Sequence, residues 1–206
     1  MKAALFDLDG VIIDTEPSYS IFWHGIGVKY NVGIAGFADA IKGTTLTQIL
    51  DRYFSPDLHD EIISQLDEYE RSMEYRLFPD ALPFLNYLSS SGVPCAIVTS
   101  SNREKMANLW RQHPALIGCF QAIITDEDVT HSKPDPEPYL IGASRLGVPS
   151  QDTWVFEDSF NGLLSGRRAG AHVVALATTN PYESLVDKAD IVIREFSEFP
   201  LTELTD

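Results

Sequence analysis

The stretch FDLDGVIID, residues 6–14, decides how the rest of this sequence is interpreted. It overlaps a short apolar run, residues 2–6, that has the pattern of a buried strand and stops at an acid. Residues two apart in a strand point to the same face, so Asp7 and Asp9 converge where the chain turns at Gly10. Two like charges repel unless a cation, a proton or a ligand compensates. We therefore predict that Asp7 and Asp9 carry the chemistry, with a plain turn as the alternative.

The composition is that of a globular protein with an acidic surface. The 206 residues are 44% hydrophobic, which suffices for a substantial core. The net charge of -15 argues against nucleic acid and anionic membrane as partners. Asp7 interrupts the apolar run that a signal peptide needs, and no stretch is long enough to span a bilayer. Cys95 and Cys119 form no C-x-x-C motif, so we expect neither a zinc site nor a redox pair, and a cytoplasmic location.

Two regions of the chain have different patterns. Residues 15–78 have helical spacing, whereas strands and helices alternate from residue 79 onward, which predicts a parallel sheet with right-handed crossovers. The predicted strands are 2–6, 93–99, 122–125, 153–157, 172–177 and 190–193. The predicted helices are 45–54, 59–75, 81–91, 104–112, 136–146, 159–169 and 181–188. The fold class is therefore α/β, with a Rossmann-like core (residues 1–14 and 79–206) and a small inserted α-helical domain (residues 15–78).

Two polar segments near the predicted strand ends suit an anionic ligand. Residues 99–102, Thr-Ser-Ser-Asn, offer hydroxyl and backbone N–H groups at a helix start, where a phosphate binds well. A simple helix cap is the alternative for this segment. Lys133 lies in the segment SKPDP, residues 132–136, whose prolines stiffen the loop. Both segments would face the carboxyl edge of the sheet, the usual ligand site in such folds.

Four carboxylates are expected at this same edge. Glu157 and Asp158 end an apolar strand in the way that Asp7 and Asp9 follow the first one. A helix cap explains one such acid but not four. Four carboxylates and a phosphate would repel one another, so a hard divalent cation with oxygen ligands, Mg²⁺, is predicted as the cofactor.

Other motifs point to structure or are missing. Gly162, Gly166 and Gly170 recur at every fourth position and indicate close helix packing, with Gly170 ending the helix. The sequence has no G-x-x-x-x-G-K-[ST] loop and no G-x-G-x-x-G after a strand. This argues against a nucleotide triphosphatase or a dinucleotide-dependent enzyme.

Four motifs together resemble those of the haloacid dehalogenase (HAD) superfamily, in its phosphatase and β-phosphoglucomutase branch. DLDGV at residues 7–11 resembles the first motif, and Thr99 at the end of its strand resembles the second. KPDP at residues 133–136 resembles the third motif, and EDS-x-x-G at residues 157–162 the fourth. The motifs stand in the family order and cover nearly the whole chain. The resemblance implies the HAD fold, with the cap domain at residues 15–78.

The resemblance also implies catalytic roles. Asp7 would attack phosphorus to form an aspartyl-phosphate, and Asp9 would protonate the leaving alcohol and then deprotonate water. Asp7, the Asp9 carbonyl group and Asp158 would bind Mg²⁺, with Glu157 assisting directly or through water. The phosphoryl oxygens would be held by Thr99 and Lys133.

The expected partner is a small phosphorylated metabolite, best described as a sugar phosphate. The predicted substrate-binding residues are Gly10, Ser100, Ser101 and Asn102 in the core, and Glu16, Tyr19, Lys42, Gly43 and Thr44 in the inserted domain. Ordinary surface is the alternative for those in the inserted domain. The sequence indicates no oligomeric state.

Alternative functions remain open at the level of sequence. A dehalogenase is disfavoured, because members of that kind typically lack the acid found here at Asp9. A sugar-phosphate mutase of this branch typically carries a histidine near the position of Tyr19 and an arginine in the cap loop, where this chain has KGTTL at residues 42–46. This difference favours hydrolysis. Pyrophosphate and nucleoside monophosphates stay open as substrates, and a non-catalytic binding protein would be expected to lose Asp7, Asp9 or Lys133.

Overall fold

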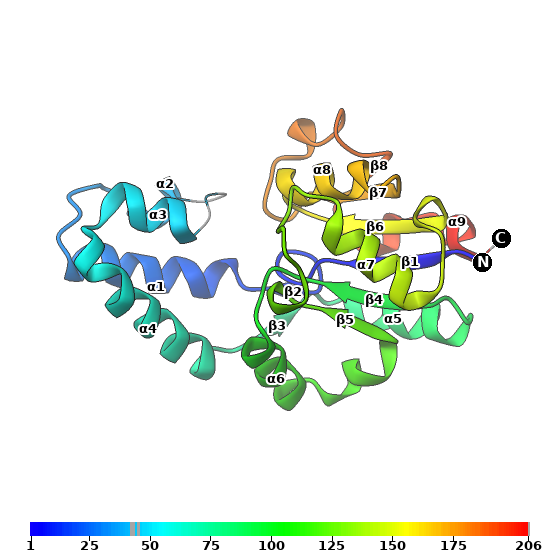
Figure 1. Ribbon diagram of the computed structural model, residues 1–206, viewed down its shortest axis with the longest axis horizontal. Coiled ribbons are helices and arrows are strands. Elements are labelled where there is room, and N and C mark those ends of the chain that lie inside the picture. The colour runs from blue at the N-terminus through cyan, green and yellow to red at the C-terminus, as the bar shows by residue number, and fades with distance from the viewer. Residues whose placement is uncertain (42–43, 45, 206) are drawn as a thin grey trace. The chain divides into compact units, whose positions relative to one another are not determined.

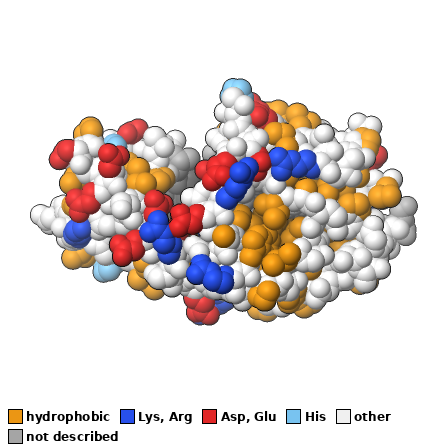
Figure 2. Space-filling view, turned by 60° about the horizontal axis from the view of Figure 1, so that its bottom comes forward, with side chains coloured by type: hydrophobic (Ala, Val, Ile, Leu, Met, Phe, Trp, Pro, Cys, Tyr) orange, Lys and Arg blue, Asp and Glu red, His pale blue; other side chains and the backbone are white. Residues whose placement is uncertain are grey.

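The computed structural model of the chain describes residues 1–41, 44 and 46–205. The chain forms two compact units, one made of Met1–Asp14 with Arg76–Asp206 and the other of Thr15–Tyr75. None of the helices in the described ranges has both the length and the apolar run that crossing a bilayer requires. On the face drawn in Figure 2, Lys and Arg side chains lie among those of Asp and Glu.

The first unit is built on a six-stranded parallel sheet with the order β5-β4-β1-β6-β7-β8 (Figure 1). Its strands are β1 (Ala3–Phe6), β4 (Cys95–Val98), β5 (Ala122–Ile124), β6 (Thr153–Glu157), β7 (His172–Leu176) and β8 (Ile191–Ile193). The central strand β1 pairs with β4 on one side and β6 on the other. All six predicted strands are present, and the predicted α/β fold class is confirmed. Because the sheet is parallel, the carboxyl ends of the strands meet at one edge.

Apolar layers cover both faces of the sheet. Helices α7 (Glu137–Leu146) and α8 (Phe160–Arg168) pack on one face (Figure 1). The other face carries aromatic rings: Phe6 of β1 stacks on Phe156 of β6 at 4.7 Å between centroids, and Phe84 packs edge-on against Phe6. Burying strands on both faces requires nearly continuous apolar sequence, which is why the strands were recognisable from sequence.

The remaining helices of this unit are α5 (Ala81–Ser90), α6 (Arg103–Gln112) and the short α9 (Thr202–Thr205). The predicted helix 181–188 is wrong, because only a 3₁₀ turn forms there, at Tyr182–Ser184. In this stretch Leu185 is fully buried while Val186 is 57% exposed. A single buried side chain does not provide the apolar stripe that holds a longer helix against a core.

The second unit, Thr15–Tyr75, is helical. It contains α1 (Glu16–Lys29), α2 (Phe37–Ala40), α3 (Leu46–Tyr53) and α4 (Pro56–Ser72), which enclose their own apolar cluster. Helix α4 begins three residues before the predicted start, with Pro56 in its first turn, a position that suits proline. Two short antiparallel strands of the first unit, β2 (Ile13–Asp14) and β3 (Arg76–Leu77), stand at the points where the chain enters and leaves this unit.

Candidate active site

Lys133 joins three strands at the carboxyl edge of the sheet. Its Nζ lies 2.8 Å from Oδ1 of Asp7, which follows β1, and 2.7 Å from Oε1 of Glu157, the last residue of β6. The same Nζ donates to the carbonyl oxygen of Val98 at the end of β4, at 2.9 Å. The Lys133 side chain is 7% exposed, so the ammonium group is held by partners from three strands and hardly reached by water.

The carboxylate of Glu157 is fully buried and accepts hydrogen bonds on both oxygens. Oε1 accepts from Lys133 Nζ and from the Tyr139 hydroxyl at 2.9 Å. Oε2 accepts from the backbone N–H groups of Asp158 and Ser159, both at 3.1 Å, and from the Ser159 hydroxyl at 3.0 Å. A carboxylate offers about four lone-pair directions. These hydrogen bonds indicate that Glu157 holds Lys133 in place. They make a direct role for Glu157 as a metal ligand less favourable.

Two further carboxylates lie beside this pair and are strongly perturbed. Burial, followed by the charges of Glu157 and Asp7, raises the pKa of Asp158 well above its usual range. Burial also raises the pKa of Asp7 to about 7, with Lys133 opposing the shift. Although burial alone disfavours its charge, Asp7 and Glu157 raise the pKa of Lys133 above its ordinary value. When ionised, the three carboxyl groups carry more negative charge than the single positive charge of Lys133 can offset.

The donor set of this cluster fits Mg²⁺. Asp7, Glu157 and Asp158 each offer a carboxylate oxygen, and these atoms lie within 4.8 Å of one another. Oxygen-only ligands with excess negative charge are what a hard divalent cation requires. The raised pKa values of Asp7 and Asp158 agree with a cation site, because a bound cation would favour the charged forms of both carboxylates.

A turn in the first motif brings the backbone close to Asp158. Gly10 has a φ of 75°, and a Cβ atom at this position would overlap the Asp158 carboxylate. The carbonyl oxygen of Gly10 accepts a hydrogen bond from the Thr178 hydroxyl, and Asn180 Nδ2 donates to the Asp158 carbonyl oxygen at 2.8 Å. Glycine is therefore needed here for the backbone conformation and for the close approach. Its predicted part in substrate binding stays a prediction.

The second acid of the opening motif has a different environment. Lys105 Nζ lies 2.7 Å from Oδ1 and 2.8 Å from Oδ2 of Asp9, and the Ser101 hydroxyl donates to Oδ2 at 3.0 Å. The Lys105 side chain is 4% exposed, whereas Asp9 is 31% exposed. Asp9 therefore keeps one side open to solvent while a buried cation contacts both of its oxygens.

The four residues after β4, residues 99–102, differ in what their side chains contact. The buried Thr99 hydroxyl oxygen accepts from the Ser101 N–H at 3.0 Å, and a hydroxyl group that accepts one hydrogen bond can still donate another. Asn102 caps α6 by accepting from the Lys105 N–H at 2.8 Å, so the helix-cap alternative describes its side chain. Ser101 contacts Asp9, and Ser100 is exposed at the strand end. Phosphate binding by Thr99 and Ser100 remains compatible with this arrangement.

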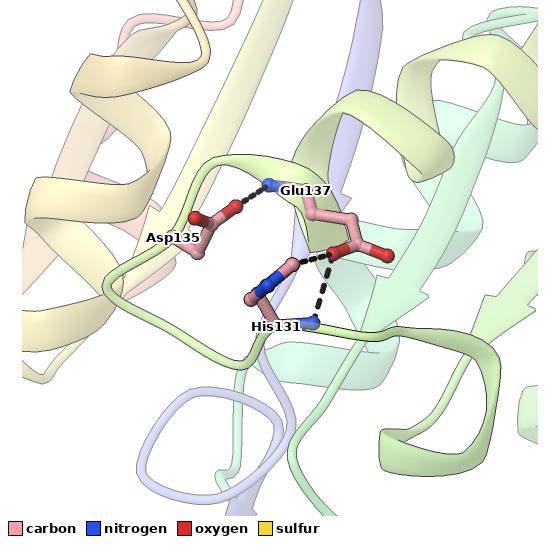
Figure 3. A group of neighbouring side chains, drawn as sticks. All are labelled: His131, Asp135 and Glu137. Atoms are coloured by element: carbon pink, nitrogen blue, oxygen red, sulfur yellow. Dashed lines mark hydrogen bonds and ion pairs between the residues drawn. The ribbon is translucent and has the colours of Figure 1, made fainter.

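The loop that carries Lys133 is braced by the cluster in Figure 3. Glu137, at the start of α7, accepts from the backbone N–H groups of Thr130 at 2.7 Å and His131 at 2.8 Å, and its carboxylate lies 2.9 Å from His131 Nδ1. Asp135 accepts from the Glu137 N–H at 2.9 Å (Figure 3). These three residues could also offer ligand atoms to a cation. Their hydrogen bonds are sufficiently explained by loop bracing.

Comparison with known proteins decides the family. The family model of haloacid dehalogenase-like hydrolases matches residues 4–176, which includes all four motifs. The chain belongs to this family. The prediction made from the four motifs is therefore confirmed, and so is the enzyme class, since curated relatives in the family are phosphatases.

Two curated relatives and one solved structure illustrate the similarity. The chain is 29% identical to hexitol phosphatase A of Escherichia coli over 212 residues, covering 98% of this chain and 94% of that protein. It is 32% identical to glycerol-1-phosphate phosphohydrolase 2 of Saccharomyces cerevisiae over 209 residues, covering 94% and 82%. A HAD hydrolase of family IA, variant 3, from Entamoeba histolytica has the same fold, with a TM-score of 0.87 at 24% identity, covering 100% and 98% of the two chains.

The candidate residues of the helical unit are described within that unit alone. The Tyr19 hydroxyl donates to Glu70 at 2.7 Å, and Glu16 begins α1 and accepts from the Ser20 hydroxyl at 3.4 Å. Thr44 is exposed and donates to the Ile41 carbonyl oxygen. The predictions for Lys42 and Gly43 concern residues that lie outside the described ranges. A role in substrate binding for any of these five residues stays a prediction.

Three groups that contact the candidate site residues are not predicted from the sequence. Lys105 could have been recognised from its position, because a lysine in the first turn of a helix is unfavourable next to the positive end of the helix dipole and indicates an acidic partner. The residues Thr178 to Asn180 follow a predicted strand, as the recognised clusters do, and could have been found by the same rule. Tyr139 lies on the buried side of α7, where an aromatic residue gives no sign of a polar contact.

Proposed function

We propose that the chain is a Mg²⁺-dependent phosphatase that hydrolyses small phosphorylated polyols or sugars through an aspartyl-phosphate. One observation carries the proposal: the Asp7 carboxylate is held by Lys133 at the end of β1, beside the buried carboxylate of Asp158. This arrangement orients a nucleophilic oxygen, supplies a positive charge for a phosphoryl group and leaves a set of oxygen ligands for a cation.

The proposed first step transfers the phosphoryl group to the protein. An Asp7 carboxylate oxygen forms a bond to phosphorus as the bond between phosphorus and the alcohol oxygen breaks, and Asp9 gives its proton to that oxygen. In the second step Asp9 takes a proton from water, the water oxygen attacks phosphorus, and the bond to Asp7 breaks to release phosphate. In this proposal Lys133, which contacts Asp7, and the Thr99 hydroxyl would hold the phosphoryl oxygens.

The proposed metal ligands are Asp7, Asp158 and the Asp9 carbonyl oxygen. When bound, Mg²⁺ would neutralise charge on the phosphoryl group during transfer. We assign Glu157 to holding Lys133, because both of its oxygens already accept hydrogen bonds from residues of the chain. This assignment departs from a direct metal role for Glu157.

The substrate class is inferred from the relatives. One is named a hexitol phosphatase and another a glycerol-1-phosphate phosphohydrolase, which share a phosphate ester of a polyhydroxylated chain. The helical unit would act as a cap that excludes water and selects the leaving group. A cytoplasmic location is inferred from the same substrate class.

A sugar-phosphate mutase is the second candidate function, and the environment of Tyr19 helps to distinguish it from a phosphatase. The Tyr19 hydroxyl is engaged with Glu70 inside the helical unit, where mutases of this branch typically have a histidine. This supports hydrolysis over transfer to a second sugar hydroxyl. Inorganic pyrophosphate is the remaining alternative substrate.

The test is phosphate release from a panel of polyol phosphates, sugar phosphates, pyrophosphate and nucleoside monophosphates, with Mg²⁺ and then with EDTA. We expect metal-dependent release, fastest with a polyol or sugar phosphate. The panel includes β-glucose 1-phosphate, with glucose 6-phosphate measured alongside. Formation of glucose 6-phosphate without comparable phosphate release would show a mutase. Release that is unchanged in EDTA would contradict the Mg²⁺ requirement.

A further inference from the structure

The contact between Lys105 and Asp9 is the feature of the core that the proposed mechanism leaves unused. Lys105 reaches Asp9 from the first turn of α6, 96 positions further along the chain, with contacts to both carboxylate oxygens at 2.7 and 2.8 Å. Its side chain is 4% exposed, although a lysine is normally solvated. Withdrawing an ammonium group from water is unfavourable, so its burial calls for a specific partner.

The local structure of α6 fixes where this ammonium group lies. Asn102 caps the helix by accepting from the backbone N–H of Lys105, which sets the position at which the lysine side chain leaves the helix. Ser101, the residue before the cap, donates its hydroxyl to Oδ2 of the same carboxylate. Two side chains near the start of α6, those of Ser101 and Lys105, thus donate to the Asp9 carboxylate.

We propose that Lys105, with Ser101, is the positioning residue for Asp9 in the phosphoryl transfer, and this inference rests on the proposed function. Lys105 contacts both oxygens and thereby restricts rotation of the carboxylate. A proton can pass between Asp9 and the alcohol or water oxygen only if that carboxylate is directed at it. The 31% exposure of Asp9 leaves its other side accessible to a ligand.

This role makes a specific kinetic prediction. An alkyl leaving group needs a proton as it departs, whereas p-nitrophenolate hardly does. Loss of Lys105 should therefore lower kcat/KM, which reports transfer of the phosphoryl group to Asp7 and not the later attack by water, for an alkyl phosphate, and change kcat/KM for p-nitrophenyl phosphate much less. A purely structural role for the lysine would reduce both activities together.

The experiment compares wild type, Lys105→Met, Asp9→Asn and the double variant, using the best alkyl phosphate of the panel and p-nitrophenyl phosphate. We expect Lys105→Met to lower kcat/KM for the alkyl phosphate by about 10- to 100-fold, since a misplaced catalytic group costs up to about 100-fold. The double variant should be no slower than Asp9→Asn alone, since Lys105 acts through Asp9. Lys105→Arg, which keeps the charge, should recover part of the lost kcat/KM.

Arg103→Met is the matched control, because Arg103 lies two residues earlier on α6 and pairs with Glu127 and Asp128 instead. It should leave the ratio of the two activities unchanged. If Lys105→Met does not fold, as judged by circular dichroism, Ser101→Ala provides the second test and should shift the ratio in the same direction.

Equal loss of both activities, no loss, or additive losses in the double variant would overturn the role of Lys105 while leaving the phosphatase intact. A wild-type protein that hydrolyses no phosphate ester would overturn the proposed function, and this inference with it.

Discussion

At the scale of single residues, Lys133 is the cation around which the buried carboxylates are arranged. It contacts Asp7 and Glu157 at 2.8 and 2.7 Å, and the Glu157 side chain is fully buried. Replacing a buried ion pair by apolar groups is often tolerated, but removing one partner leaves the other charge without compensation. Lys133 should therefore contribute to stability as well as to phosphate binding.

Lys133→Met is expected to lower the free energy of unfolding by about 3 kcal/mol and to abolish turnover. The loss arises because Asp7 and Glu157 remain buried without their cation. Urea unfolding measures the change. Lys188→Met is the control, since Lys188 pairs with Asp187 at the surface with 41% of its side chain exposed, and we expect little effect there. Equal stability losses in the two variants would contradict the account.

At this scale, sequence reasoning identified residues that stand in a recognisable local setting. Lys133 is predicted because Pro134 and Pro136 follow it and stiffen its loop, and Asp7 and Asp9 because they follow an apolar strand. The Lys105 contact joins residues 96 positions apart, and only the way α6 packs on the sheet brings them together. The Glu157 hydrogen bonds are likewise set by tertiary packing, so the sequence alone could not separate a metal ligand from a residue that holds Lys133.

At the scale of elements, α8 lies close enough to the sheet to depend on its glycines. A Cβ atom at Gly162 would overlap the Glu157 carboxylate, and one at Gly166 would lie 3.1 Å from Val155 and 3.2 Å from Val173. Ser159 caps the helix by accepting from the Gly162 N–H at 3.0 Å. The close packing expected from this glycine spacing is thus present.

Gly162→Ala is expected to destabilise the protein by about 1–3 kcal/mol and to reduce activity, because the added methyl group displaces a carboxylate that several hydrogen bonds fix in place. Unfolding by urea and phosphate release measure the two effects. Gly25→Ala, within α1, is the matched control, since no atom lies within 4 Å of the added carbon. It should instead stabilise its helix by about 0.5–1 kcal/mol. The same sign for both variants would contradict the packing argument.

Helices and strands were predicted correctly where their burial requires a recognisable pattern of apolar residues in the sequence. The apolar strands of the sheet were all found within about two residues of their observed ends, the usual error of such boundaries. Helix α1 was not singled out, because Phe22 and Trp23 are buried while Ile21 and Val28 are 68% and 69% exposed. Apolar residues spread around a helix hide its period.

At the scale of the whole molecule, the acidic balance is one reason why we expect the site to need a cation. The chain carries a net charge of -15, and Asp7, Glu157 and Asp158 add a local excess that Lys133 offsets only in part. Because the pKa of Asp7 is raised from 3.8 to about 7, the folded protein holds this proton more tightly than the unfolded chain. This group alone makes stability fall as the pH rises from about 4 to 7.

Mg²⁺ should reverse that loss, and more strongly at high pH, because the cation binds the ionised carboxylates. We expect Mg²⁺ at about 100 times its dissociation constant to stabilise the fold by about 2.7 kcal/mol at pH 8, and by less at pH 5.5. Thermal unfolding with and without Mg²⁺ at the two pH values measures this. The variant Asp158→Asn, which removes a proposed ligand, distinguishes stabilisation by Mg²⁺ at the site from stabilisation by Mg²⁺ bound non-specifically to the acidic surface. An equal or larger stabilisation at pH 5.5 would contradict the assignment.

The most direct test of the central claim is recovery of the phosphoryl group on Asp7. The protein is mixed with a ³²P-labelled polyol phosphate in Mg²⁺, quenched in acid and digested. The account predicts label on the peptide that contains Asp7, and neither label nor turnover in Asp7→Asn, which removes the nucleophile's charge with little change in volume. Sustained turnover by folded Asp7→Asn, or label on another residue, would show that Asp7 is not the nucleophile.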